Sequence, residues 1–154
     1  MDQEIEKISV IVIDASAVTR YLLSEILEQT GDIKVVASVH DHAEALNQIQ
    51  NLKPHVVTFD VAMPGMNGLT FLQKLMELHP TPVVIISAMT PYHKDSVVKA
   101  MELGAVAYVG KQTSQTWSGI LGMADEIIAK IRSASTAQVQ GSISADGQAA
   151  ADNF

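Results

Sequence analysis

The sequence predicts an α/β fold in which one parallel sheet carries helices on both of its faces. Five short apolar runs alternate along the chain with five stretches in which apolar residues recur at helical spacing. The apolar runs are rich in Val and Ile and almost free of polar residues, as strands covered on both faces should be. Such strict alternation is typical of parallel strands joined by right-handed crossover helices.

The elements follow one another in a regular order. The predicted strands are residues 8–14, 33–39, 55–60, 82–87 and 105–110. Apolar stripes at helical spacing predict the five helices between and after them. The stripe residues are Val18, Leu22, Leu23, Ile26 and Leu27; Leu46 and Ile49; Leu69, Leu72, Leu75 and Met76; Val97, Val98 and Met101; and Ile120, Ala124, Ile127, Ile128 and Ile131. Gly31, Pro54, Pro80 and Gly104 follow the first four stripes, and residues of these two types commonly end helices.

Length and composition place the folded part of the chain in one domain. The 154 residues are 47% hydrophobic and 18% charged, a globular composition with enough chain for a core that needs no disulfide or structural metal. After about residue 132 the sequence SASTAQVQGSISADGQAAADNF has almost no large apolar residue, so it would not bury enough surface to offset its ordering entropy. We therefore predict a domain at residues 1–132 and a flexible tail or truncated linker at residues 133–154.

The composition also excludes several classes of function. No apolar run approaches the roughly 20 residues that span a bilayer, and the acidic start MDQEIEK does not resemble a signal peptide. The absence of Cys excludes thiolate metal sites and Cys nucleophiles. With a net charge of −7 and no basic stripe, binding to nucleic acid phosphates is not expected. These features predict a cytoplasmic protein with no nucleic acid or membrane partner.

Four polar residues stand where four of the predicted strands end: Asp14, Asp60, Ser87 and Lys111. In open α/β sheets, ligands bind in the crevice beyond the carboxyl ends of the parallel strands. The four side chains would therefore deliver two carboxylates, a hydroxyl and an ammonium group to one small site. Each residue alone is a weak signal, because Asp often ends strands and a lone Lys is usually a solvated charge. The joint pattern is far more specific.

This set of residues suits a cation and a phosphoryl group. An aspartate can accept a phosphoryl group as an acyl phosphate, in a reaction that depends mostly on positioning and charge neutralisation. Lys111 would contact one phosphoryl oxygen as a point charge, and the Ser87 hydroxyl would donate to another. Mg²⁺ prefers oxygen ligands and keeps several waters. Asp14, Asp60 and a backbone carbonyl near Ala62 would therefore form a minimal cation site.

Several stretches of the sequence resemble the receiver domains of bacterial response regulators. They are VIDASAVTRYLLSEIL, KPHVVTFDVAMPGMNGLTFLQKLM, HPTPVVIISAMT and AMELGAVAYVGK, and the resemblance covers about residues 8–132. Within that family the chain is most similar to the N-terminal receivers of the chemotaxis protein-glutamate methylesterases. The resemblance implies a flavodoxin-like (βα)5 fold with the strand order 2-1-3-4-5.

The resemblance also implies a function and its partners. Asp60 would be phosphorylated by a histidine kinase, with Ser87 and Lys111 as site partners and Mg²⁺ as the cofactor. Tyr108 stands where the family has an aromatic switch that changes rotamer together with Ser87. The surface of the fourth helix, fifth strand and fifth helix is the candidate contact for an effector domain, downstream or absent, or for a second copy in a homodimer. No Gly-flanked Ser elbow for ester hydrolysis is present, so the chain is predicted not to be an enzyme.

Two positions depart from the family pattern. Ala15 follows Asp14 where the family has a second acid, which by that pattern is a direct cation ligand. Losing even an indirect partner lowers metal affinity or activity roughly 10- to 100-fold, so this loss should weaken Mg²⁺ binding at least as much. Fewer acids also mean less repulsion beside Asp60, which favours its pairing with Lys111. Gln112 replaces the proline that normally follows the lysine, which predicts a different loop there.

Three functions from different classes remain as hypotheses. The first is a receiver that accepts a phosphoryl group on Asp60 with weakened metal binding. The second, suggested by Ala15, is a pseudo-receiver, in which the same fold acts as an unphosphorylated interaction module. The third is an enzyme of similar fold, and it ranks last. The segment DASAVTR lacks the Ser/Thr/Gly-rich phosphate loop of a flavin carrier, and Ser16 stands where an Asp-dependent phosphohydrolase has its second Asp.

A further candidate is a transition-metal site at His40, Asp41 and His42. These residues come directly after the second predicted strand, and no further ligand is near them in the sequence. Helix capping preferences alone account for Asp41. We therefore predict that this segment begins a helix and does not bind a metal.

Overall fold

The computed structural model describes residues 6–61, 67–88, 94–111, 119 and 121–137. Its strands are β1 (Ile8–Ile13), β2 (Ile33–Val39), β3 (Val56–Phe59), β4 (Val83–Ala88) and β5 (Ala107–Lys111). Its helices are α1 (Ala17–Glu28), α2 (His42–Leu52), α3 (Gly68–Leu78), α4 (Lys94–Leu103) and α6 (Ala124–Ala134). Within these ranges, no helix has the length and apolar character needed to cross a membrane.

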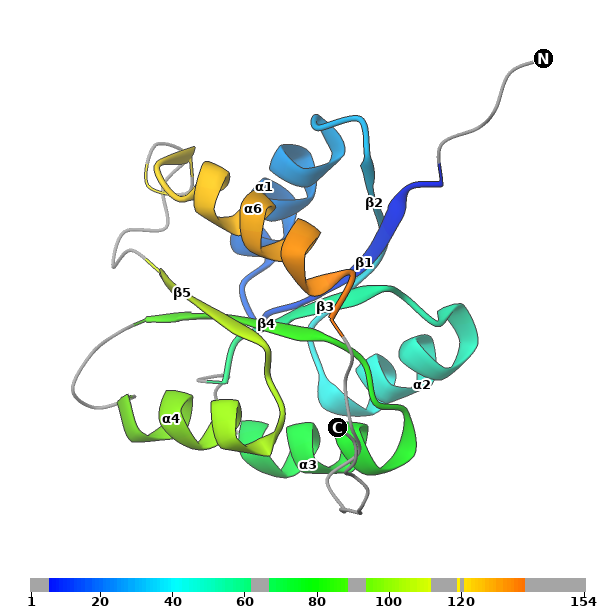
Figure 1. Cartoon of the computed structure of the whole chain (residues 1–154), viewed down its shortest axis with the longest axis vertical. Helices are drawn as coiled ribbons and strands as arrows, with labels where there is room; N and C mark the ends of the chain where they lie inside the picture. Colours follow the sequence, from blue (N-terminus) through cyan, green and yellow to red (C-terminus); the bar gives the residue numbers. More distant parts are fainter. Residues whose placement is uncertain (1–5, 62–66, 89–93, 112–118, 120, 138–154) are drawn as a thin grey trace.

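The five strands form one parallel sheet in the order β2-β1-β3-β4-β5. Helices α1 and α6 lie on one face of the sheet, and α2, α3 and α4 lie on the other (Figure 1). The predicted flavodoxin-like, doubly wound sheet is therefore confirmed, including its strand order. Because β1, β3, β4 and β5 are neighbours that run in the same direction, their carboxyl ends share one edge of the sheet.

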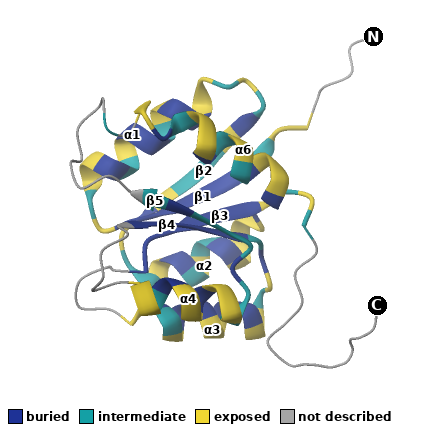
Figure 2. Ribbon diagram, turned by 60° about the vertical axis from the view of Figure 1, so that its left-hand side comes forward, coloured by how far each residue is buried: buried dark blue, intermediate teal, exposed yellow. Residues whose placement is uncertain are grey.

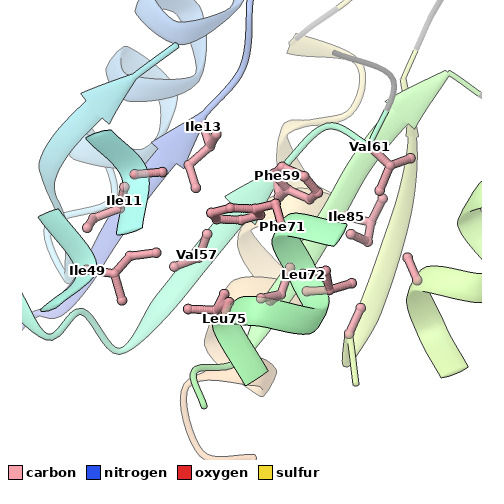
Figure 3. Close-up of a cluster of buried hydrophobic side chains, with 14 of the residues drawn as sticks. Ile11, Ile13, Ile49, Val57, Phe59, Val61, Phe71, Leu72, Leu75 and Ile85 are labelled. Atoms are coloured by element: carbon pink, nitrogen blue, oxygen red, sulfur yellow. The ribbon is translucent and has the colours of Figure 1, made fainter. Parts of the chain in front are cut away.

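Burial explains why the apolar runs become strands. All of β3 and the last four residues of β1 are buried, and the sheet is the most buried layer in Figure 2. One core cluster fills the space between the sheet and α2, α3 and α4, and Figure 3 shows Phe59 and Phe71 side by side within it. A second cluster joins the opposite face to α1 and α6, with Leu23 and Ile127 completely or almost completely buried.

Polar side chains begin the three helices that follow β1, β2 and β3. The caps are Ser16, Asp41 and Asn67, and each side chain accepts a hydrogen bond from the backbone N–H three residues further along the chain. Such caps satisfy N–H groups that have no partner inside the helix. The prediction that Asp41 begins a helix is confirmed.

The stripe prediction is wrong at three positions. Val18, Val98 and Met101 have exposed fractions of 56%, 49% and 38%. In α4 the buried residues are Val97 and Ala100, each directly before an exposed one. A single step along a helix rotates the side chain by about 100°, so the following residue points away from the sheet.

The predicted strands agree with the observed ones to within two residues at each end. Gly104 ends α4 as predicted, and its φ of +129° is one that residues with a side chain rarely adopt. A Cβ atom at this position would also lie only 3.2 Å from the side chain of Met76. At the other boundary, α6 continues to Ala134, two residues beyond the predicted end of the domain. The predicted stripe residue Ile120 and residues 138–154 of the predicted tail lie outside the described residues, so the division at residue 132 stays a prediction.

Candidate functional site

The predicted site residues stand at the carboxyl ends of adjacent strands. They are Asp14 after β1, Asp60 after β3, Ser87 near the end of β4 and Lys111 at the end of β5. The backbone of Lys111 pairs with that of Ala88, so it ends β5 next to the end of β4. The Lys111 side chain and Ala62 lie outside the described part of the structure, and the contacts predicted for them stay predictions.

Asp60 and Ser87 are joined directly. The Ser87 hydroxyl donates a hydrogen bond of 2.8 Å to Oδ1 of Asp60. The exposed fractions of Ser87 and Asp60 are 0% and 9%, so little water competes for this contact. Hydrogen bonds to an ionised acceptor are also roughly twice as strong as those between neutral groups. The fold thus brings together two residues 27 positions apart in the sequence and holds the carboxylate at the sheet edge.

Asp14 stands beside this pair at the end of β1. Ile13 pairs with Phe59, so the two aspartates directly follow paired residues of neighbouring strands. Asp14 is 3% exposed, and its Oδ1 accepts a hydrogen bond of 2.9 Å from the backbone N–H of Ser16. Ala15, where the family has an acid, is exposed. An acidic side chain at position 15 would therefore not contribute to the packing of the core.

The donor set at this edge fits a hard cation. Two buried carboxylates at neighbouring strand ends offer the oxygen ligands that Mg²⁺ prefers, with water completing its shell. Among the residues that the structure describes, no three His, Cys, Asp or Glu side chains are grouped to hold a metal ion. Among the described residues at this edge, the carboxylates that could bind a cation are those of Asp14 and Asp60, and the prediction that the segment with His40 and His42 binds no metal stays a prediction.

The sequence analysis missed one residue at this edge, Arg20. It lies in α1, is half-buried, and reaches back to the loop between β1 and α1. Its Nη1 donates to the carbonyl oxygen of Asp14 at 2.7 Å and to that of Ala15 at 3.4 Å. The only signal in the sequence is a cation six residues after the strand-end aspartate, close enough for a side chain of this length to reach back over the first turn of a helix.

Tyr108 connects the site to α6. Its hydroxyl donates a hydrogen bond of 3.2 Å to the backbone carbonyl of Ser87. Lys130 of α6 donates at 2.6 Å to the backbone carbonyl of Tyr108 and forms a 2.9 Å ion pair with Glu126. Burial, and secondarily the charge of Glu126, raise the pKa of Tyr108, so its phenol keeps its proton at neutral pH. Contacts therefore continue from Asp60 through Ser87 and Tyr108 to α6.

His42 supports the strand that carries Asp60. Its ring stacks on Phe71 with a centroid distance of 4.7 Å and lies 5.7 Å from Phe59, the residue before Asp60. Nε2 is buried and makes no hydrogen bond within the described residues. Burial lowers the pKa of His42, although the charge of Asp41 acts in the opposite direction. The ring is therefore a neutral packing group.

Comparison with known protein families identifies the family to which the chain belongs. The family described as "Response regulator receiver domain" matches residues 10–117 of the chain. The chain is a response regulator receiver. The resemblance inferred from the sequence motifs is thereby confirmed, and the matched stretch of the receiver contains Asp14, Asp60, Ser87, Tyr108 and Lys111.

In sequence, the receiver is similar to part of several proteins named protein-glutamate methylesterases. It is 44% identical over 132 residues to protein-glutamate methylesterase/protein-glutamine glutaminase 2 of Xanthomonas oryzae pv. oryzae (strain MAFF 311018), which is 86% of this chain and 37% of that protein. It is also 44% identical over 134 residues to the corresponding protein of Nitrosomonas europaea, covering 87% of this chain and 37% of that protein. The matched stretch therefore spans little more than a third of the length of these relatives.

Solved structures lead to the same conclusion. The response regulator domain of Thermotoga maritima CheB matches with a TM-score of 0.79 and 33% identity, over 86% of this chain and 99% of that chain. The receiver domain of nitrogen regulatory protein C matches with a TM-score of 0.66 and 27% identity, over 86% of this chain and 97% of that chain. The receiver is therefore CheB-like in both sequence and fold.

Proposed function

We propose that this receiver accepts a phosphoryl group on Asp60 from a phosphohistidine of a histidine kinase. The observation that carries the proposal is the buried hydrogen bond of 2.8 Å between Ser87 and Asp60, at the edge where strands β1, β3, β4 and β5 end. In the transfer, a carboxylate oxygen of Asp60 forms a bond to phosphorus as the bond from phosphorus to the histidine nitrogen breaks. The electron pair of that bond leaves with the imidazole, which takes up a proton.

The residues around Asp60 support this chemistry by position and charge. When Mg²⁺ is bound, it neutralises charge on the transferring group, and Asp14 and Asp60 would hold it. The Ser87 hydroxyl is already beside the accepting carboxylate and would donate to the product. From the family resemblance we assign Lys111 as the positive partner of the phosphoryl group and a backbone carbonyl of Ala62 as a further cation ligand.

Ala15 is the basis for the second part of the proposal, that the cation binds weakly. The loop between β1 and α1 supplies one carboxylate, from Asp14, where the family pattern has two. We expect an Mg²⁺ affinity lower by at least about 10- to 100-fold than with an acid at position 15. Phosphorylation would then be slow unless the Mg²⁺ concentration is high.

The same observation favours a second candidate function. A receiver with too little affinity for Mg²⁺ would act as an unphosphorylated interaction module that presents its surface to partner proteins. The chain of contacts from Ser87 through Tyr108 to Lys130 would then be a fixed structural support and not a switch.

One experiment separates the two functions. The receiver is incubated with a small phosphodonor such as acetyl phosphate over a range of Mg²⁺ concentrations, and its intact mass is measured. We expect a gain of one phosphoryl group that is absent from Asp60→Asn and retained by Asp95→Asn, a matched change at an exposed acid in the first turn of α4. If the mass stays unchanged at saturating Mg²⁺, phosphorylation is ruled out and the interaction module is supported.

A further inference from the structure

We infer that Arg20 is a positioning residue for the cation site, because its guanidinium group holds the loop that presents Asp14. The inference rests on the proposed function, since it concerns the same site. Neither the sequence motifs nor the family pattern used above assigns Arg20 a role. Its importance follows from the combination of its contacts with the missing acid at position 15.

The contacts of Arg20 fall on the two residues that decide the cation site. Its Nη1 donates to the carbonyl oxygens of Asp14, at 2.7 Å, and Ala15, at 3.4 Å. The backbone N–H of Arg20 also donates to the carbonyl of Ser16 at 3.0 Å, in the first turn of α1. The guanidinium group therefore connects α1 to two successive backbone carbonyls that follow β1, while the bond to Ser16 is the ordinary hydrogen bond of the first helical turn.

The carboxylate of Asp14 is fixed by the same loop. Its Oδ1 accepts from the backbone N–H of Ser16, and the Ser16 hydroxyl in turn caps α1 by accepting from the N–H of Thr19 at 3.1 Å. The direction of the carboxylate therefore depends on the backbone conformation of residues 14–16. Arg20 stabilises that conformation from outside the loop through its guanidinium group, which holds its N–H donors in a fixed planar geometry.

The missing acid makes this support more important. With Ala15 in place, Asp14 is the only carboxylate that the loop offers, so a small rotation of its backbone removes the whole contribution of β1. Groups that orient metal ligands without touching the metal typically change affinity about 10- to 100-fold when they are removed. We expect Arg20 to act in this way.

A competing effect has the opposite sign and makes the inference testable. The positive charge of Arg20 repels Mg²⁺, so removing the charge would tighten binding if repulsion were the larger effect. Removing a positioning contact would instead weaken binding. The direction of the change in affinity therefore distinguishes the two roles.

The test measures Mg²⁺ binding to the full chain with Ala15 in place, from the rise in melting temperature over a range of Mg²⁺ concentrations, and by calorimetry in Ala15→Asp, where binding is expected to be strong enough to titrate. Arg20→Met, which keeps an apolar stem and removes the donors, is expected to raise the Mg²⁺ dissociation constant at least tenfold with Ala15 in place and by less in Ala15→Asp, and Arg20→Lys is expected to recover part of the loss. The matched control is Arg132→Ala, which removes an exposed guanidinium that pairs with Asp32 at 3.0 Å. It should leave Mg²⁺ binding unchanged.

Thermal unfolding without Mg²⁺ is measured for every variant, so that a loss of affinity can be compared with a loss of fold. If Arg20→Met is too unstable to titrate, Arg20→Lys carries the test, with weaker Mg²⁺ binding expected at a nearly unchanged melting temperature. Unchanged or tighter binding in the Arg20 variants, or no Mg²⁺ binding by Ala15→Asp, would overturn the inference. Because no phosphodonor is used, the Mg²⁺ affinities can be interpreted even if the receiver is never phosphorylated.

Discussion

The strands β1 and β3 both end in a buried aspartate, but the two aspartates are held in different ways. Asp60 accepts a hydrogen bond from Ser87 on the neighbouring strand β4, a contact between distant parts of the chain. The carboxylate of Asp14 accepts a hydrogen bond from the backbone N–H of Ser16, two residues further along the chain, and its carbonyl oxygen accepts one from Arg20. The carboxylate of Asp60, the proposed phosphoryl acceptor, is thus held by a neighbouring strand, whereas the carboxylate of Asp14, the proposed cation ligand, is held by its own loop.

The difference explains how the fold tolerates Ala15. A position in an exposed loop can lose a carboxylate with little effect on packing, because nothing in the core depends on it. Ser87 is completely buried within the sheet and has no such freedom. We therefore expect substitutions at the β1 end to change ligand affinity and substitutions at the β3 and β4 ends to change stability.

The largest expected effect comes from restoring the acid in the loop. Ala15→Asp should increase Mg²⁺ affinity by at least about 10- to 100-fold, since it adds a ligand to the site. It should also lower stability in the absence of Mg²⁺, because a third carboxylate adds repulsion beside Asp14 and Asp60, and Mg²⁺ should restore that stability by binding the folded state. Calorimetry and thermal unfolding with and without Mg²⁺ provide both measurements.

Ala15→Asn is the control for that change, because it adds a side chain of nearly the same size without the charge. It should leave stability without Mg²⁺ close to that of the original chain. An equal gain in Mg²⁺ affinity from both substitutions would mean that the charge at position 15 is not what limits the cation site.

The next largest effect is expected at the hydrogen bond between Ser87 and Asp60. Ser87→Ala removes the donor to a buried carboxylate and should lower the free energy of unfolding by about 1 to 2 kcal/mol. Ser133→Ala, at an exposed position of α6, should change it by less than about 0.5 kcal/mol. Urea unfolding of both variants measures the difference. Similar values for the two would show that the contact with Asp60 contributes little to the fold.

The same contrast between sheet and loop describes what the sequence could predict. The strands were predictable because short apolar runs that alternate with helical stripes are compatible with few arrangements, and the family resemblance supplied the strand order. The meeting of Asp60 and Ser87 followed from the shared edge of parallel strands. Such features depend on repeated patterns, which a single sequence displays.

The role of Arg20 was not predictable in the same way. A cation in the first half of a helix is usually exposed, and its contacts to backbone carbonyls depend on the loop geometry before α1, which no pattern of residue types encodes. The exposure of Val98 and Met101 was missed for a related reason. Helical spacing alone does not fix which side of a broad apolar stripe faces the sheet.

A smaller effect on stability is expected at Tyr108, which connects Ser87 to α6. Tyr108→Phe removes the hydroxyl that donates to the carbonyl of Ser87 and should lower the free energy of unfolding by about 0.5 to 1 kcal/mol. Tyr21→Phe removes a hydroxyl from a side chain that is 63% exposed and should have almost no effect. The pair is compared by urea unfolding at neutral pH, and equal values would mean that the Tyr108 hydroxyl makes no net contribution.

The smallest expected effect is a pH dependence of the free energy of unfolding that arises from His42, which packs against Phe59. Burial lowers the pKa of His42 below its ordinary value of 6.5, so the unfolded chain binds a proton more readily than the folded one. This contribution to stability is complete above pH 6.5 and is lost as the pH falls through the folded pKa. His42→Phe keeps an aromatic ring against Phe71 without a titrating group, so it should flatten this part of the curve of unfolding free energy against pH. His40→Phe, at an exposed position, should keep the slope, and a slope that survives in His42→Phe would have to arise from another residue.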